Sequence, residues 1–315
     1  MKKYIILLAF LIVSTGLIAQ KADSLKKGSS AEKKDNPADS LLNSMSSDNK
    51  KEPVIGFRST RLILSQTTET IKKNTLNFMV MHRFGDFAGK NGGGQFFYGL
   101  DDVADVYIGF EYGLTDNLNI EFGRSTVSTL GGLVDLELKY AIIHQSTDGS
   151  TPVSITVLGQ SGVRPYQSFN TFGSRLSYFG QAIISRQFGS KFSLQISPGF
   201  VQDNTAYPLL AGNEEDFFSL LVAMRLKITK HMSLVVDYAH PFSTFRQNNG
   251  FSDPLGFGIE VETGGHVFTL NISNARATQE INYLSDTQSD YGRGQYRIGF
   301  TISRIFDFNH KSSYK

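Results

Sequence analysis

The chain of 315 residues contains no cysteine and no tryptophan, and its formal net charge is only +2. The absence of cysteine excludes disulfides, thiolate metal sites, a cysteine nucleophile and an amino-terminal lipoprotein cysteine. The small net charge gives no indication of a nucleic-acid partner. Beyond the amino terminus the sequence has no long apolar run, which argues against a helical membrane protein.

The first 53 residues have two compositions. Residues 1–19 have the pattern of a secretory signal peptide, because Lys2 and Lys3 precede an apolar stretch that is too short for a membrane anchor. Residues 20–53 consist mainly of Lys, Ser, Asp and Asn, so they bury too little apolar surface to offset their ordering entropy. We expect residues 20–53 to form a disordered periplasmic leader.

Apolar and polar residues alternate in the rest of the chain. Near its end, Tyr296, Ile298, Phe300 and Ile302 share one face, and polar residues occupy the positions between them. Successive side chains of a strand point to opposite faces, so this pattern predicts a strand with one apolar face. A tilted strand of about ten residues is long enough to cross a membrane. Strands are expected at residues 76–84, 105–114, 118–123, 134–142, 153–157, 175–188, 192–197, 218–228, 232–238, 257–262, 268–273 and 292–308.

The links between these segments alternate in length. Tight links rich in Asp, Asn, Gly or Ser are separated by longer ones, with residues 125–131 as the one short exception. Short periplasmic turns and longer extracellular loops are typical of outer-membrane barrels, and an even strand number leaves both termini in the periplasm. We therefore predict an all-β fold, an up-and-down antiparallel transmembrane barrel of about twelve strands. It would span residues 54–308, with residues 309–315 as a tail, in a Gram-negative outer membrane. A soluble β-sandwich or β-helix is the alternative.

Charged residues fall on the polar face of the predicted strands. A charge on the lipid face at mid-membrane costs about 2–4 kcal/mol, so these side chains are expected to face the lumen. Opposite charges on neighbouring strands would pair there. Whether the lumen is a narrow pore or is plugged stays open at this point, because such a barrel lies between filled small barrels and open porins. The lumen-facing candidates are Asp105, Glu111, Glu121, Asp135, Glu137, Lys139, Arg225, Lys227, Glu260, Glu262 and Arg297.

Two further features precede or follow the first strand. Residues 57–70 would form an extra strand, a plug in the lumen or a periplasmic cap, and Arg58 and Arg61 would suit a lumen with acidic walls. His82, Arg83 and Asp101 bracket the first long loop. We expect these three residues to anchor the loop to the barrel rim by hydrogen bonds, with an anion site as the functional alternative.

Three runs carry a resemblance to a known family: TRLILSQTTE, LNFMVMHRFGD and FFYGLDDVADVYIGFEYGLTDNLNIEFGRS. They resemble a group of predicted outer-membrane β-barrel proteins of Bacteroidota-type bacteria that is catalogued as a domain of unknown function. The resemblance extends over residues 57–308. It implies an outer-membrane barrel and brings neither an activity nor catalytic residues.

Three functions are compatible with this pattern. The first is a narrow pore or transporter for small polar solutes. The second is a non-conducting scaffold or secretion-associated barrel that docks a periplasmic or surface protein through the leader and residues 57–70. The third is a hydrolase at the rim, but the candidates Ser128, His144, His240 and Asp253 form no recognisable constellation. We expect outer-membrane lipid as a partner. We do not expect the protein to be an enzyme or to hold a cofactor or a metal ion.

Overall fold

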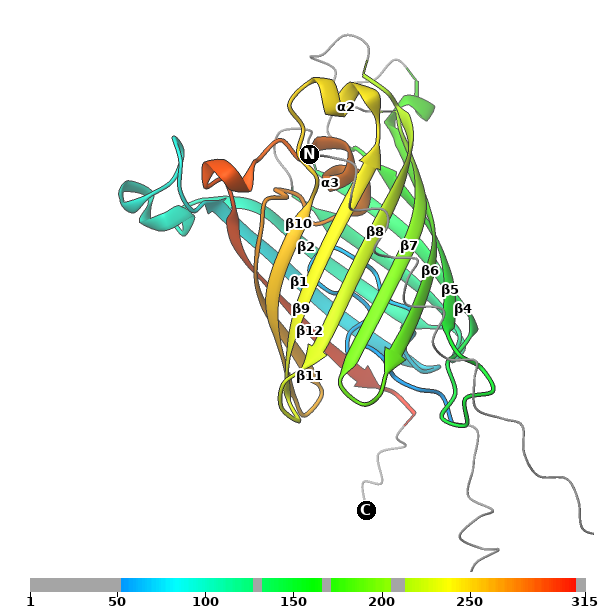
Figure 1. Ribbon diagram of the computed structural model, residues 1–315. Helices are drawn as coiled ribbons and strands as arrows, with labels where there is room; N and C mark the ends of the chain where they lie inside the picture. Colours follow the sequence, from blue (N-terminus) through cyan, green and yellow to red (C-terminus); the bar gives the residue numbers. More distant parts are fainter. Residues whose placement is uncertain (1–51, 127–131, 166–170, 205–212, 310–315) are drawn as a thin grey trace, which may run out of the picture. The chain divides into compact units, whose positions relative to one another are not determined.

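The computed structural model describes residues 52–126, 132–165, 171–204 and 213–309. The predicted signal peptide, nearly all of the leader, Ser128 and residues 310–315 lie outside the described residues. Within these ranges, twelve antiparallel strands each pair with the next along the chain, and β1 pairs with β12 to close a barrel (Figure 1). The predicted fold class is therefore confirmed. The strands are β1 (Thr75–Asp86), β2 (Val103–Gly113), β3 (Leu118–Ser125), β4 (Leu133–Ile143), β5 (Ser154–Val163), β6 (Leu176–Phe188), β7 (Phe192–Asp203), β8 (Asp216–Lys227), β9 (Met232–Phe242), β10 (Leu255–Thr263), β11 (His266–Ser273) and β12 (Arg297–Asp307).

The alternation of the sequence appears as two surfaces of the barrel wall. In β12, Arg297, Gly299 and Thr301 are buried, whereas the apolar residues between them lie on the outside. Large apolar side chains such as Phe122 and Leu270 are 55% and 60% exposed, as suits a face that lipid covers. Closure of β1 on β12 leaves no strand edge unpaired, which a membrane-spanning sheet requires.

Strand β6 has the least regular alternation in the sequence, and its environment explains why. Its inward face carries Phe179 and Ile183, which are 2% and 0% exposed, beside polar residues. Phe179 belongs to a hydrophobic cluster inside the lumen, so an inward position here requires an apolar side chain. A barrel whose interior is filled by protein does not need a uniformly polar inner face.

The two ends of the barrel differ. At one end, called here the short-turn end, lie the tight turns together with the start of β1 and the end of β12, where Thr75 pairs with Asp307. The opposite, long-loop end carries the helices α2 (Thr244–Asn248) and α3 (Glu280–Asp286) (Figure 1). None of the helices in the described residues is long and apolar enough to cross a membrane.

Residues 57–70, called here the luminal hairpin, lie inside the barrel (Figure 1, blue). The hairpin reverses direction where Arg61 bridges Gln66 and the Leu62 amide donates to the Ser65 carbonyl at 2.8 Å. Its polar residues from Ser59 to Arg61 and from Ser65 to Thr68 are buried together with its apolar ones, whereas Arg58 is exposed and Glu69 and Thr70 are partly exposed. The hairpin is not a strand of the wall, because β1 pairs with β2 and β12. Of the three interpretations left open by the sequence, the structure supports the plug.

Candidate functional site

The tip of the luminal hairpin is held by charged groups of the wall. The Asp237 carboxylate on β9 accepts hydrogen bonds from the backbone amides of Ile63 and Leu64, both at 2.8 Å. On the other side, the Arg83 guanidinium of β1 donates to the Ile63 carbonyl at 2.9 Å. A hairpin turn leaves backbone groups unpaired, and here wall side chains satisfy them in place of water.

A row of three glutamates crosses β2, β3 and β4 beside the hairpin. Glu111 lies directly opposite Glu121, and Glu121 lies directly opposite Glu137, so the three carboxylates form what is called here the glutamate row. All three are buried. Like charges directly opposite each other destabilise a sheet, so the row requires compensating donors.

Neighbouring side chains supply those donors. The Tyr107 hydroxyl donates to Glu121 at 2.6 Å, and Lys139 lies 3.9 Å from Glu111. From the hairpin, the Thr60 hydroxyl donates to Glu111 at 2.7 Å and the Gln66 amide donates to Glu137 at 3.0 Å. The hairpin therefore contributes part of the hydrogen bonding that a buried carboxylate needs.

Arg61 of the hairpin is a second cation beside the glutamate row. It is 1% exposed, and its Nη1 lies 3.0 Å from Glu280 of α3. Its Nη2 lies 3.8 Å from Glu137, and the guanidinium carbon is 5.9 Å from the centroid of the Tyr107 ring. Burial alone would lower the pKa of Arg61, but the nearby carboxylates, Glu280 first, outweigh burial and raise this pKa well above its ordinary value.

Helix α3 reaches the hairpin from the long-loop end. Besides the ion pair to Arg61, the Tyr283 hydroxyl donates to the Leu64 carbonyl at 3.0 Å. Leu62, Ile63 and Leu64 share a hydrophobic cluster with Tyr283 and with wall residues. The hairpin and α3 thus meet inside the lumen and occupy part of it.

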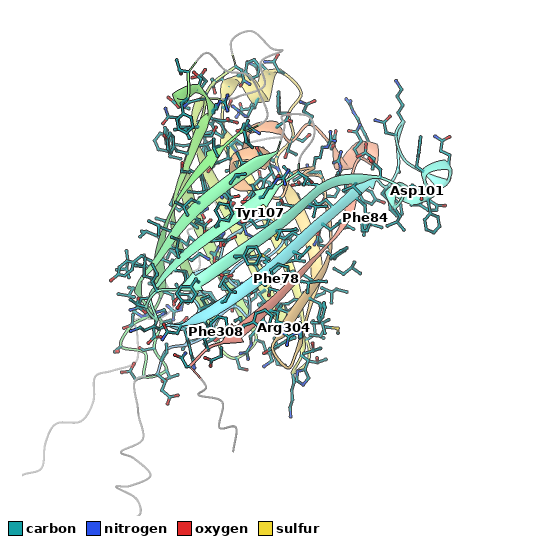
Figure 2. All side chains as sticks on the ribbon, turned by 180° about the vertical axis from the view of Figure 1, so that it is seen from behind. Phe78, Phe84, Asp101, Tyr107, Arg304 and Phe308 are labelled. Carbon is teal, nitrogen blue, oxygen red and sulfur yellow. The ribbon has the colours of Figure 1, made fainter. Side chains whose placement is uncertain are left out.

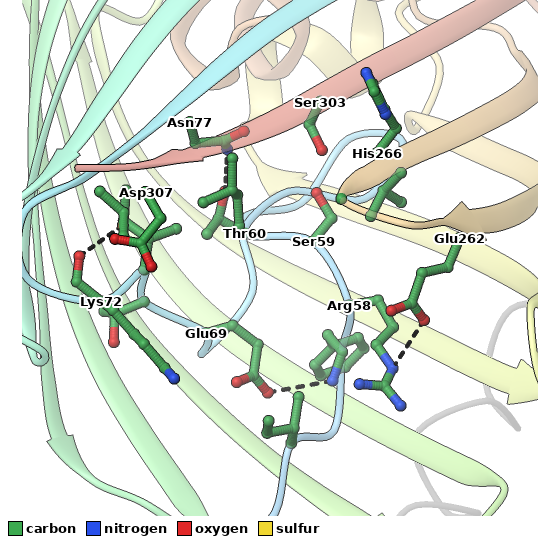
Figure 3. Close-up of a pocket in the computed structure, with 18 residues that line it drawn as sticks. Arg58, Ser59, Thr60, Glu69, Lys72, Asn77, Glu262, His266, Ser303 and Asp307 are labelled. Carbon is green, nitrogen blue, oxygen red and sulfur yellow. Dashed lines mark hydrogen bonds and ion pairs between the residues drawn. The ribbon is translucent and has the colours of Figure 1, made fainter. Parts of the chain in front are cut away.

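A cavity of about 360 Å³ lies at the short-turn end, between the hairpin and strands β1, β10, β11 and β12 (Figure 3). At its wall, the Glu69 carboxylate accepts from the backbone amides of Gly56 and Phe57 at 3.0 and 3.2 Å. Burial raises the pKa of Glu69 to about 7, against these two hydrogen bonds. Arg58 and Glu262 form an ion pair at 3.3 Å beside the cavity.

The predicted lumen-facing residues lie on β2, β3, β4, β8, β10 and β12. All of them are buried except Lys227 and Glu262, which are partly exposed near the short-turn end. Arg225 pairs with Glu260 at 2.7 Å, on a side of the wall away from the glutamate row. Arg297 pairs with Asp86 at 2.7 Å near the long-loop end.

Some residues of the site are absent from the sequence-based candidates. Tyr107 and Asp237 lie on the polar face of their predicted strands. This position could have identified both as lumen-facing residues. Glu280 lies in a long link and gave no signal, because its partner Arg61 is 219 residues away in the sequence.

The loop anchor expected from His82, Arg83 and Asp101 is not formed. Adjacent residues of a strand face opposite sides, so His82 points outward, where its ring stacks on Phe300 at 5.3 Å, while Arg83 points into the lumen. Asp101 lies on the first long loop, which extends away from the barrel wall (Figure 2). The three side chains do not meet.

The candidates for a rim hydrolase are also separated. His240 Nδ1 lies 2.9 Å from Asp253 at the long-loop end, and Asp253 also accepts from Tyr238 at 2.5 Å. Among the described residues, no serine hydroxyl is hydrogen-bonded to His240. His144 contacts Asn117 near the short-turn end. No group of His, Asp and Glu in the described ranges is arranged to hold a metal ion.

Comparison with known proteins identifies the family. The family model described as "Membrane bound beta barrel domain (DUF5777)" matches residues 57–306. The chain belongs to this family. The DUF5777 match begins at the first residue of the luminal hairpin, so the hairpin is part of the family domain together with the wall. No curated protein matches the sequence.

The chain is also similar to several solved structures, among them a porin and two outer-membrane proteins. A NanC porin structure has 9% identity and a TM-score of 0.44, and the alignment covers 73% of this DUF5777 chain and 98% of the porin. An outer membrane channel from Pseudomonas putida F1 has 12% identity and a TM-score of 0.43, covering 76% and 98% of the two chains. The outer membrane protein Omp33 from Acinetobacter baumannii has 8% identity and a TM-score of 0.41, covering 74% and 99%.

Proposed function

We propose that this DUF5777 protein is a gated outer-membrane pore for small polar solutes, with the luminal hairpin as its gate. One observation carries the proposal: the hairpin meets much of the wall through polar contacts although it is buried. Besides the contacts to the glutamate row, the Thr68 and Ser185 hydroxyls are hydrogen-bonded at 2.7 Å. The side-chain amide of Gln195 donates to the Gln66 carbonyl, also at 2.7 Å. Water can replace such partners at modest net cost when the hairpin withdraws.

The connectivity of the hairpin also supports withdrawal. It leaves the lumen at the short-turn end on both sides, since the Val54 amide donates to the Gln145 carbonyl at 2.7 Å and β1 begins at Thr75. Between the hairpin and β1, Asn74 has a φ of 58°, a conformation that marks a sharp change of direction. The hairpin can therefore move out of that end without threading a chain terminus through the barrel.

The orientation belongs to the proposal. We place the short-turn end and the termini in the periplasm, where a protein partner could pull on the leader. Because the chain has no cysteine of its own, single introduced cysteines report the orientation of the barrel in the membrane directly. A membrane-impermeant maleimide should label Asn248→Cys on α2 in intact cells, and Lys230→Cys on a tight turn only after the outer membrane is permeabilised. The reverse pattern would invert the orientation.

A disulfide lock tests the gate in the full chain. Thr68 and Ser185 are hydroxyl neighbours on the hairpin and β6, and Thr68→Cys with Ser185→Cys places two thiols close enough for a bond. In planar bilayers, the wild type should show openings. The oxidised double variant should lose them and regain them on reduction. Thr68→Cys alone, treated in the same way, is the control and should not respond to oxidant.

A non-conducting barrel is the second candidate, favoured by the hydrophobic contacts of the hairpin tip. Leu62, Ile63 and Leu64 are at most 1% exposed and pack with Val235 and Tyr283, so withdrawal exposes apolar surface. If neither the wild type nor a variant lacking residues 57–68 conducts, while both fold as heat-modifiable barrels, the pore is excluded and this candidate stands. Neither candidate includes a catalytic step.

A further inference from the structure

We propose that the solutes of this pore are cationic, and that Arg61 occupies in the closed state the site a guanidinium or amine group takes during passage. The inference rests on the proposed function, because it names the substrate class of the same lumen. It starts from the charges of the glutamate row and from the one group of the hairpin that enters it.

The wall beside the hairpin carries more acidic than basic side chains. Glu121 lies directly opposite both Glu111 and Glu137, and Asp135 lies opposite Gly123 of β3, next to the row. Lys139 is the one cation that the wall strands β2 to β4 place in contact with this row in the described residues. Without the hairpin, three carboxylates and Asp135 therefore face a single lysine.

The hairpin brings a guanidinium into this site. Arg61 lies among Glu137, Glu280 and the face of Tyr107, which is a set of carboxylates and an aromatic ring that suits a planar cation. Arg61 belongs to the inserted segment and not to the wall. The wall groups in contact with it are therefore available to another cation once the hairpin has left.

Two buried carboxylate oxygens near Arg61 lack a donor in the described residues, and the Nε of Arg61 is unpaired as well. Glu121 Oε2 and Asp135 Oδ1 have no hydrogen-bond partner among the described residues, although the side chains are 2% and 1% exposed. Buried carboxylate oxygens without a donor are unfavourable. A solute with several N–H groups would supply the donors that one arginine leaves out.

Chemical rescue tests the site in the full chain. Arg61→Ala leaves a guanidinium-sized space, and guanidinium and urea are probes of nearly equal shape that differ in charge. At concentrations far below those that denature, guanidinium should raise the thermal midpoint of Arg61→Ala in detergent, and urea should not. The wild type should not respond, because Arg61 fills the site. Adding Glu137→Gln to Arg61→Ala should abolish the rescue.

The inference is overturned if guanidinium gives no increase, if urea gives the same increase, or if the wild type responds equally. If Arg61→Ala does not fold, a measurement of the ion selectivity of the wild-type openings tests the inference in place of the rescue experiment. In a KCl gradient the pore should prefer K⁺ severalfold over Cl⁻. Glu111→Gln with Glu137→Gln should reduce that preference, and the exposed control Glu52→Gln should leave it unchanged.

The two proposals fail in different ways. Openings that are unselective or anion-selective would overturn the cation site and leave the pore intact. Absence of openings would overturn the pore, whereas rescue of Arg61→Ala by guanidinium would still establish a cation site in the lumen.

Discussion

Single residues inside this barrel carry charges that a soluble core would rarely bury. The lumen places carboxylates directly opposite one another and offsets them with Arg61, Lys139 and neutral donors. Removal of one partner of a buried ion pair leaves the other uncompensated, which is more destabilising than loss of a surface pair. The inserted position of the hairpin therefore depends on its individual side chains and not on its apolar area alone.

Glu69 should make the stability of the barrel depend on pH. An ordinary glutamate releases its proton near pH 4.5, but in the folded protein burial raises the pKa of Glu69 to about 7. The folded state thus binds more protons across this interval, so stability should decrease as pH rises from about 4.5 to about 7. Glu69→Gln should reduce the change of the urea-unfolding midpoint over this pH range, and Glu52→Gln should leave that change as in the wild type. Equal curves for Glu69→Gln and the wild type would contradict the assignment.

Gly123 should tolerate no side chain, because the Tyr107 ring lies against it. A Cβ placed on Gly123 would lie 1.9 Å from the Tyr107 hydroxyl oxygen, whereas a Cβ on Gly159 of β5 would meet no atom within 4 Å. Gly123→Ala should destabilise the barrel by about 1–3 kcal/mol through overpacking. Gly159→Ala is the matched control and should change the unfolding midpoint little. Similar midpoints for both variants would show that the ring moves aside freely.

At the scale of elements, the wall was predictable and its contents were not. The alternation of apolar and polar residues predicted the strands. Glu111 and Arg225 lie on the polar face of their strands, which predicted that both are buried. The hairpin remained ambiguous because its position depends on contacts with distant strands. Helix α3 lies in a link that composition described only as long and polar, and its seven residues are too few to show a helical period.

If the hairpin is the gate proposed above, its contact with α3 should control opening. Tyr283→Phe removes the hydrogen bond to the Leu64 carbonyl, at a cost of about 1 kcal/mol to the closed state. That change should raise the open fraction in bilayers about fivefold. Tyr291→Phe is the matched control, since the Tyr291 hydroxyl donates to Leu255 of the wall and not to the hairpin. Equal effects of both variants would argue against coupling.

At the scale of the whole molecule, the outer surface should behave as a lipid face of defined depth. Leu270 lies at the middle of β11, and Phe308 lies just beyond β12 at the short-turn end. Leu270→Arg should destabilise the barrel in liposomes by about 2–4 kcal/mol, and Phe308→Arg by at most about 1 kcal/mol. The folded fraction on heat-modifiability gels measures both. Equal costs at the two positions would place the membrane elsewhere on the wall.

The separation of Arg61 from Glu280 has a consequence for biogenesis. The hairpin is among the first parts of the domain to be synthesised, and its acidic partner on α3 follows 219 residues later. Until the last loop arrives, the buried arginine lacks its closest counter-charge. A chain halted before that loop cannot form this ion pair, so the contact is completed only after strands β1 to β11 have been made.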